Sequence, residues 1–576
     1  MPANPVSTIV RLVALAAGAL VLSACGGGGG SGSGSDAPSP GGGGPTSPPS
    51  PPPIGKTDAF RFLNQATYGA TESEVQRLVA LGDSTTGYAR WIDEQLAQPA
   101  SVQLPTIQTA YAALANPAQM IGSLNVDRQE IWFRNSITGP DQLRQRVAFA
   151  LSEIMVVSQQ STLQNMPFAL ADYYDLLARD AFGDFRKLIG DVTLHPAMGV
   201  YLNMLGNQKP DTAKNIRPDE NYARELMQLF TVGLVELNVD GTVKTDAQGQ
   251  PIPTYDQSVI EGFANVFTGW NYSGAASFGQ ARRTLANQVL PMQAYPEQHS
   301  PLAKKLLQYP GAAKPTLAAG QTPQQDLADA LDNIFNHPNV GPFISKQLIQ
   351  KLATSNPSPQ YVARVTAVFN NDGTGKRGNL GAVVKAILLD AEARPATPSA
   401  TNGKVKEPLL RLTQMWRAYG AKAASGLYRV GNVNGAFGQG PLQSPSVFNF
   451  YSPFYAPPGE ISDQSLVSPE MQIATEYLNT TIGNAFYTYV FAWNSTATSP
   501  AANSVLLDYT AELPLVADSE ALVTKIADKM LGGQISATLK AEAKAAVERV
   551  PATNAGQRIS EALYLIATSP EFVVQR

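Results

Sequence analysis

The residues with the clearest potential for chemistry lie in one predicted helix, residues 219–232. Helical spacing places Asn221, Arg224 and Glu225 on one face, and Glu220 stands at the helix start. If that face lines a cleft and burial raises the pKa of one carboxyl group, the carboxylates could act as general acid and base in hydrolysis. The simpler alternative is a solvated polar stripe opposite an apolar face.

Glu153 is a further candidate carboxylate, at the end of a predicted helix that starts near Pro140. The apolar stripe of that helix contains Leu143, Val147, Leu151 and Ile154. We expect this stripe to pack against the apolar face of the 219–232 helix. Such packing would bring Glu153 or Arg146 near Arg224 or Glu225 and form a buried arginine–carboxylate pair.

Two glycine-containing stretches resemble ligand loops only superficially. In residues 373–378, Arg377 occupies the place where a phosphate loop needs Ser or Thr, and a predicted helix rather than a strand precedes the loop. In a calcium loop begun at Glu236, the twelfth position is Ala247, so the bidentate carboxylate is missing. We therefore expect neither nucleotide nor calcium binding, and no cofactor.

The chain has three histidines, His195, His299 and His337, and no two of them have helical i, i+4 spacing. Two of them precede proline, which favours positions at segment ends. We expect capping or surface roles for the histidines and no metal site.

The irregular stretch 437–455 is unusually aromatic. A loop of this length is typically functional or packed against the core. We expect a packed covering segment with some of its aromatic side chains buried; the alternative is that a minority stay exposed as a platform for sugar or partner binding. Its aromatic residues are Phe437, Phe448, Phe450, Tyr451, Phe454 and Tyr455.

Helical patterns dominate the elements that must position these residues. Thr71 and Glu74 form a capping box before an apolar-periodic stretch that ends at Gly82, and comparable patterns recur to the C-terminus. Strand signals are confined to residues 235–255, where two turn dipeptides favour a small hairpin. The sequence therefore predicts an all-α fold with one β excursion.

The N-terminus predicts export and lipidation. Residues 1–25 contain an apolar run too short to span a bilayer, and they end in Leu-Ser-Ala-Cys, which resembles a bacterial lipobox with Cys25 as the lipidated residue. Residues 26–55 are rich in Gly, Ser and Pro, a composition typical of a disordered tether. Because Gly26 rather than Asp follows the cysteine, we expect delivery to the outer membrane of a Gram-negative cell.

Residues 56–576 have ordinary globular composition, and we expect one helical body, divided into two lobes at 56–315 and 322–576. The net charge is −4, which provides no basic field for binding nucleic acid. The expected contacts are the membrane, through the lipid, and an envelope protein or glycan.

Five segments occur in a recognisable order: FLNQATYG at 62–69, NYARELM at 221–227, FTGW at 267–270, HPNVGPFI at 337–344 and KVKEP at 404–408. With these segments the chain resembles the bacterial family called domain of unknown function 1800, from about residue 57 to 575. The resemblance implies an exported, mostly helical protein without an established activity, and adds Trp270 to the candidate binding residues. Many members carry Trp-His-Asn-His-Phe where this chain has no histidine, at 150–155, and some have Glu and His where Gln228 and Phe230 stand. A metal centre of that kind is not expected here.

Two hypotheses of function follow. The first is a tethered interaction or assembly protein of the cell envelope, with Asn221, Trp270, Phe450, Tyr451 and Tyr455 as candidate binding residues. The alternative is a hydrolase of an envelope or extracellular polymer, with Glu153, Glu220, Arg224 and Glu225 as candidate catalytic residues. One concave pocket shared by Glu153 and Glu225 would favour the enzyme, whereas separate solvated faces would favour the interaction protein.

Overall fold

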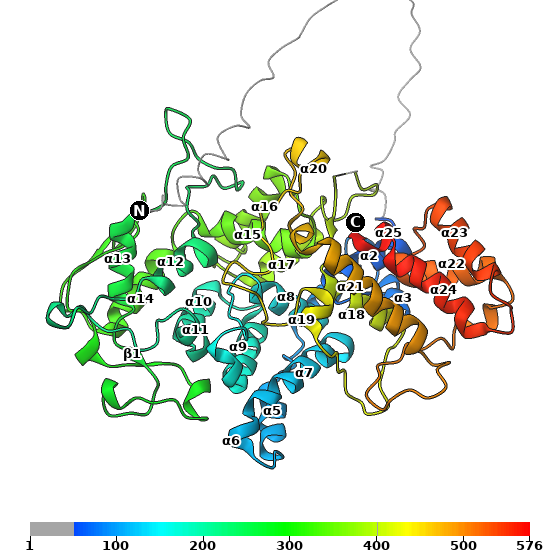
Figure 1. Cartoon of the computed structure of the whole chain (residues 1–576). Coiled ribbons are helices and arrows are strands. Elements are labelled where there is room, and N and C mark those ends of the chain that lie inside the picture. The colour runs from blue at the N-terminus through cyan, green and yellow to red at the C-terminus, as the bar shows by residue number, and fades with distance from the viewer. Residues whose placement is uncertain (1–50, 400) are drawn as a thin grey trace, which may run out of the picture.

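The computed structural model describes residues 51–399 and 401–576, so the predicted signal segment, Cys25 and most of the predicted tether lie outside the described residues. The described chain is mainly helical, as predicted (Figure 1). Its first helices are α2 (Lys56–Ala66), α3 (Glu72–Ala80), α4 (Gly87–Leu96), α5 (Leu104–Ala112), α6 (Pro117–Met120), α7 (Leu124–Thr138), α8 (Gln142–Ser152), α9 (Pro167–Asp180), α10 (Phe185–Leu194), α11 (Pro196–Tyr201), α12 (Asn221–Glu225) and α13 (Gln257–Val266). The later ones are α14 (Pro323–Phe335), α15 (Val340–Leu352), α16 (Pro359–Asn370), α17 (Leu380–Leu389), α18 (Pro408–Ala418), α19 (Val433–Phe437), α20 (Glu460–Asp463), α21 (Glu476–Tyr487), α22 (Ser519–Leu531), α23 (Ala537–Glu548), α24 (Ala555–Thr568) and α25 (Pro570–Val573).

Strand structure is limited to short antiparallel pairs. β1 (Trp270–Asn271) pairs with β2 (Gln293–Ala294), β3 (Lys304–Lys305) with β4 (Thr316–Leu317), and β5 (Lys404–Val405) with β6 (Val574–Gln575). Residues 235–255 form the predicted hairpin as three antiparallel bridges, at Val235–Pro253, Leu237–Val243 and Thr245–Pro251. The three two-stranded sheets that the described residues form outside that region, each built from strands of two residues, were not predicted.

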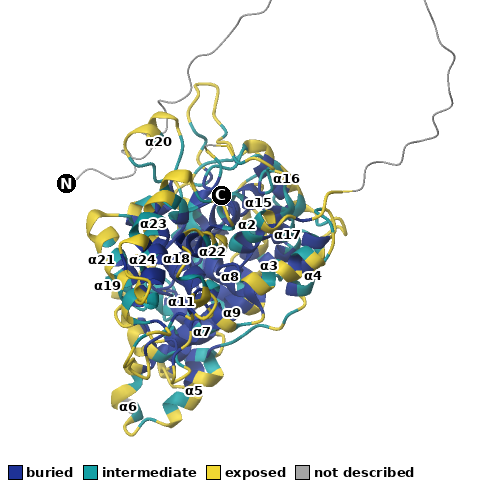
Figure 2. Ribbon diagram, turned by 90° about the vertical axis from the view of Figure 1, so that its right-hand side faces the viewer, coloured by how far each residue is buried: buried dark blue, intermediate teal, exposed yellow. Residues whose placement is uncertain are grey.

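The main apolar core runs through almost the whole described chain, from Ile54 to Phe572. Figure 2 shows these buried segments inside a shell of exposed helix faces and loops. A smaller cluster lies between α5, α7 and α9 and contains Ile107, Leu124, Ile131, Phe168 and Ala171. The division into two lobes stays a prediction. Among the described helices, none combines the length and apolar character needed to cross a membrane.

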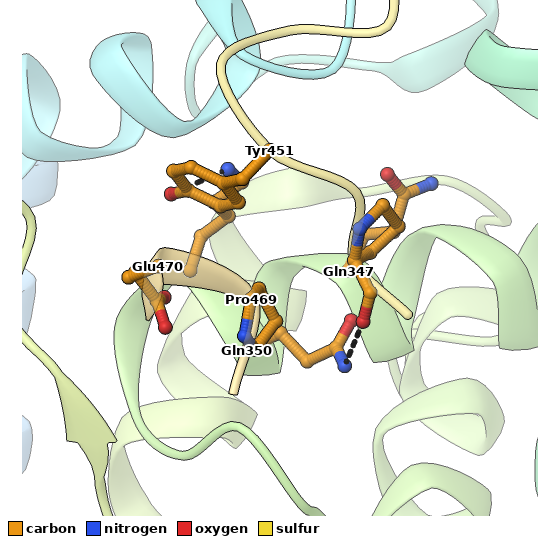
Figure 3. Close-up of a pocket in the computed structure, with 7 residues that line it drawn as sticks. Gln347, Gln350, Tyr451, Pro469 and Glu470 are labelled. Atoms are coloured by element: carbon orange, nitrogen blue, oxygen red, sulfur yellow. Dashed lines mark hydrogen bonds between the residues drawn. The ribbon is translucent and has the colours of Figure 1, made fainter. Parts of the chain in front are cut away.

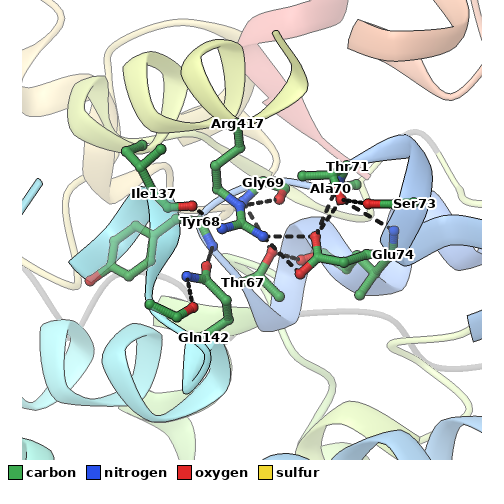
Figure 4. Close-up of polar contacts among 12 residues, drawn as sticks. Thr67, Tyr68, Gly69, Ala70, Thr71, Ser73, Glu74, Ile137, Gln142 and Arg417 are labelled. Carbon is green, nitrogen blue, oxygen red and sulfur yellow. Dashed lines mark hydrogen bonds and ion pairs between the residues drawn. The ribbon is translucent and has the colours of Figure 1, made fainter. Parts of the chain in front are cut away.

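Arg417 of α18 connects that helix to the N-terminal segment around Gly69 and Glu74 (Figure 4). Its Nη2 donates to both carboxylate oxygens of Glu74 at 2.8 and 2.7 Å, and its Nε donates to the carbonyl of Gly69 at 2.7 Å. Glu74 also completes the predicted capping box with Thr71. Gly69 has φ +136°, and a Cβ there would lie 2.5 Å from Cα of Gln414, so the close approach of α18 requires glycine. The segment 62–69 therefore has a structural role.

The region predicted as a helix over 219–232 is divided. After α12, the residues Leu226–Thr231 form a π-helix, η4, in which the Thr231 hydroxyl donates to the carbonyl of Leu226. α12 packs on α13, whereas α8 packs mainly on α9, α4, α7 and α15. The expected packing of α8 on this helix is therefore wrong. Every residue of α8 is buried, so its apolar stripe is only one of several faces that contact neighbouring helices.

Candidate functional site

Glu153 lies in a buried network of charged side chains, directly after α8. Lys351 of α15 donates from Nζ to Oε2 of Glu153 and to the hydroxyl oxygen of Tyr451, both at 2.9 Å. The hydroxyl group of Tyr451 also lies 3.4 Å from Oε2 of Glu153 and donates to it. The structure thus joins two residues that the sequence analysis placed in different hypotheses, Glu153 as catalytic and Tyr451 as binding.

A second carboxylate, Glu407, faces Glu153 from the start of α18. The side-chain amide of Gln439 donates to Oε1 of Glu153 at 3.0 Å and to Oε2 of Glu407 at 2.6 Å. Lys404 lies 3.6 Å from Glu407 and 2.9 Å from Glu470. We call these residues the charged cluster: Glu153, Lys351, Lys404, Glu407, Gln439, Tyr451 and Glu470, all of them buried.

The two carboxyl groups differ in proton affinity. Burial, reinforced by the negative charge of Glu407, raises the pKa of Glu153 to about 7 despite the opposing charge of Lys351. Burial also raises the pKa of Glu407, but the positive charges of Lys404, Lys351 and Arg146 outweigh it and lower that pKa to about 2. Such a divided pair can act as one proton donor and one permanent anion.

A small cavity adjoins the charged cluster at Lys351, Tyr451 and Glu470. Figure 3 shows the adjoining cavity, whose volume is about 10 Å³, room for about one water molecule. Across it, the side-chain amide of Gln350 donates to the carbonyl of Pro453 at 3.2 Å. The lining residues are Gln347, Gln350, Lys351, Tyr451, Pro453, Pro469 and Glu470. The side chain of Glu153 is only 2% exposed, so a polymer substrate cannot reach it in this conformation.

The predicted buried pair involving Arg224 is wrong. Arg224 donates to Glu220, one helical turn earlier, at 2.6 Å, and both side chains are partly exposed. Gln257 of α13 bridges the same two side chains, and the backbone amide of Asn221 donates to Asp219. Glu153 pairs with Lys351 instead of Arg224. Because Glu220 and Arg224 are both accessible to water, this part of the polar face of α12 is a solvated stripe, which was the simpler alternative.

Glu225 lies in a separate place from the cavity beside the charged cluster. It is 9% exposed, and its Oε2 has no hydrogen-bond partner among the described residues. Burial raises its pKa, opposed by the charge of Arg224. Its negative charge adds to the effect of burial on Tyr201, whose pKa rises to about 12. The structure therefore shows neither a pocket shared by Glu153 and Glu225 nor two solvated carboxylates.

The aromatic candidates divide by exposure. In the stretch 437–455, Phe437 and Tyr451 are buried and Phe450 and Tyr455 are partly buried, which confirms the prediction of a packed segment. Phe448 and Phe454, not chosen as candidates, are 60% and 68% exposed. Trp270 is buried in β1, so it is not available as a surface binding residue.

Most residues of the charged cluster were missed by sequence reasoning. Lys351, Gln439 and Glu470 come from distant segments that carry no recognisable pattern. Lys404 and Glu407 lie in the KVKEP segment, where two lysines and a glutamate before a helix-starting proline were an available signal. The i, i+3 spacing of Lys404 and Glu407 could have indicated an ion pair between them.

The three histidines are all buried, which contradicts a surface role, but two of them accept backbone hydrogen bonds near helix starts. His195 accepts from the amide of Ala197 at the start of α11, and His337 accepts from the amide of Asn339. His299 lies 2.8 Å from Asp326, which also pairs with Lys304 at 2.6 Å. Within residues 51–399 and 401–576, no group of three or more His, Cys, Asp or Glu side chains is arranged to hold a metal ion.

Comparison with known proteins identifies a family but no characterised relative. No curated protein and no solved structure is significantly similar to the chain. The family model described as "Protein of unknown function (DUF1800)" matches residues 61–574, nearly all of the described body and all five segments noted in the sequence. The chain therefore belongs to the DUF1800 family of proteins of unknown function.

Proposed function

We propose that this protein is an exported lipoprotein of the cell envelope that acts as an interaction or assembly protein. The lipobox ending in Cys25 and the tether after it support the anchoring. The burial of Glu153, which is only 6% exposed, argues against a polymer substrate there. The positive support for an interaction role comes from the segment 437–455.

This segment holds exposed aromatic side chains on a firmly anchored backbone. Phe437 is fully buried, and Gln439 and Tyr451 hydrogen-bond within the charged cluster. Phe448 and Phe454 lie between or just beyond these anchors and are mostly exposed. Exposed aromatic residues that are ordered before binding contribute strongly to protein interfaces, because little conformational entropy is lost on association. This is the observation that carries the proposal.

The test is partner capture from intact envelopes. We expect the wild-type chain to retain a reproducible set of cross-linked envelope components, and the double variant Phe448→Ser, Phe454→Ser to lose at least one of them. Tyr477→Ser is the matched control, because Tyr477 is an equally exposed aromatic residue outside the segment. An unchanged set of components in the double variant, with normal thermal unfolding, would contradict the interaction role of the segment.

The anchoring has its own test. We expect Cys25→Ser to leave an unlipidated precursor that no longer fractionates with the outer membrane. Wild-type size and membrane retention in this variant would show that the lipobox interpretation is wrong. Recovery of the wild-type protein in the inner membrane would contradict only the outer-membrane assignment.

The alternative function is hydrolysis, and one observation favours it. The pKa of Glu153 near 7 and that of Glu407 near 2 are the division expected of an acid and an anion in glycoside hydrolysis. Access would require the loop carrying Tyr451 and Pro453 to move. If envelope polymers are degraded, Glu153→Gln should abolish the activity at unchanged fold, and a fully active variant would exclude Glu153 as the acid.

A further inference from the structure

A groove separate from the charged cluster runs between α21 and α24, two helices that lie side by side in Figure 1. Its volume is about 560 Å³, within the range of small-molecule sites. Arg411 of α18, Val405 and Val573 are among the residues that line it. This groove is large enough for a ligand, which the cavity beside Glu153 is not.

Arg411 is a buried cation without a counter-ion. It is 6% exposed, and its Nε donates to the carbonyl of Lys406 at 3.0 Å. Across the described chain, no carboxylate pairs with Arg411, and its two terminal nitrogens donate no hydrogen bond to another residue; they are not fully buried atoms, so they are open to the groove that Arg411 lines. Arg394 also lacks a hydrogen-bond partner, but its guanidinium nitrogens are fully buried, whereas Arg411 lines an open groove. The Arg411 guanidinium is therefore accessible to an anion that the protein itself does not provide.

The neighbouring cation strengthens this argument. Lys406 is also buried, and its Nζ donates to Gln414 at 2.6 Å and lies 3.8 Å from the ring centroid of Phe572. Burial lowers the pKa of Arg411 to about 10, and burial together with the charge of Arg411 lowers the pKa of Lys406. An anion at Arg411 would offset the desolvation and the repulsion between the two cations.

The groove combines an apolar base with a polar rim. Ile482 and Phe486 are buried on its α21 side, and Asn479 and Asn484 are exposed at its edge. Gly483 and Tyr564 both line the groove, and a Cβ at Gly483 would lie 3.7 Å from the hydroxyl oxygen of Tyr564, so a large side chain at this position would occupy groove space. An apolar surface with one placed charge is typical of sites for amphiphilic ligands.

We propose that this groove binds an amphiphilic monocarboxylate, with the carboxylate on Arg411 and the hydrocarbon part against Ile482 and Phe486. The planar guanidinium matches a carboxylate in bidentate geometry. A phosphate monoester carries nearly two negative charges, whereas the groove lining offers a single cation. A free aliphatic acid is the simplest member of this class.

The test compares octanoate with octan-1-ol on the purified full chain, by calorimetry and by the shift in melting temperature. We expect octanoate to bind at least tenfold more tightly, and Arg411→Met to remove that preference while Arg411→Lys retains part of it. Arg364→Met is the control, since Arg364 is an exposed arginine paired with Asp390 outside the groove. Gly483→Phe should block both ligands at unchanged fold, and it serves as the test if Arg411→Met does not fold.

Four results would overturn the proposal. They are equal affinity for octanoate and octanol, an unchanged carboxylate preference in folded Arg411→Met, wild-type binding in Gly483→Phe, and tighter binding of octyl phosphate than of octanoate. The last result would place a different anion in the groove. None of them bears on the segment 437–455, so the proposed interaction role stands or fails separately.

Discussion

The charged cluster and the α21–α24 groove differ in whether their buried cations have carboxylate partners. In the cluster, Lys351 pairs with Glu153, and Lys404 pairs with Glu407 and Glu470. In the groove, Arg411 is just as buried but has no carboxylate beside it among the described residues. Burial is similar in both places, so two features separate Arg411 from the cations of the cluster: it has no carboxylate partner, and it lines an open groove that a ligand can enter.

The largest effect is expected from breaking the cluster. Lys351→Met should lower the free energy of unfolding by about 3–5 kcal/mol at pH 8, because it strands Glu153 beside Glu407 without the bridging cation. Urea denaturation measures the change. Lys385→Met, which removes a partly exposed ion pair with Asp93, is the control and should cost less than about 1 kcal/mol. Equal losses in the two variants would show that the cluster is not stabilised by pairing.

The pH dependence of stability sharpens the comparison at Glu153. Its pKa is raised from an unfolded value of about 4.3 to about 7, so the folded state binds the extra proton and stability is lost as pH rises through this window. Glu153→Gln should remove that fall, about 3 kcal/mol between pH 4.5 and 7.5. The lowered pKa of Glu407 affects stability at lower pH. The stabilisation that ionised Glu407 contributes is lost as pH falls from about 4 toward 2. Parallel stability profiles of wild type and variant would contradict the raised pKa.

Two buried arginines of α18 provide a matched pair. Arg417→Met removes the partner of Glu74 and should cost about 2 kcal/mol. Arg411→Met removes a charge without a partner and should leave the unliganded protein unchanged or about 1 kcal/mol more stable. Thermal and urea unfolding of the two variants decide the point. A loss at Arg411 as large as that at Arg417 would mean that Arg411 serves the fold.

The smallest effect is expected at the exposed pair of α12. Arg224→Ala should change the free energy of unfolding by less than about 0.5 kcal/mol, because both Arg224 and Glu220 remain accessible to water. The expected shift of the melting temperature is within about one degree, measured by calorimetry. A decrease of several degrees in melting temperature would show that the Arg224–Glu220 pair is structurally important.

Local patterns were predictable where neighbours in sequence decide the outcome. The capping box at Thr71 and Glu74 and the hairpin at 235–255 form as expected, because their hydrogen bonds join residues within one short segment of the chain. The π-helix at Leu226–Thr231 was missed, because a helical repeat pattern does not distinguish i+5 from i+4 hydrogen bonds. Glu153 was a candidate catalytic residue in the sequence analysis, and its role stays a prediction, but its expected pairing with Arg224 was wrong, because it pairs with Lys351.

By itself, the sequence determined the helical class, the family and the packing of the aromatic segment 437–455, since these follow from periodicity, motif order and the cost of exposing apolar side chains. Only the tertiary structure decided which charges meet. Glu153 and Lys351 are 198 positions apart, and Tyr451 is a further 100 positions along the chain. Electrostatic energy depends on distance in space and on burial, and neither can be read from sequence spacing when the contacts join remote segments.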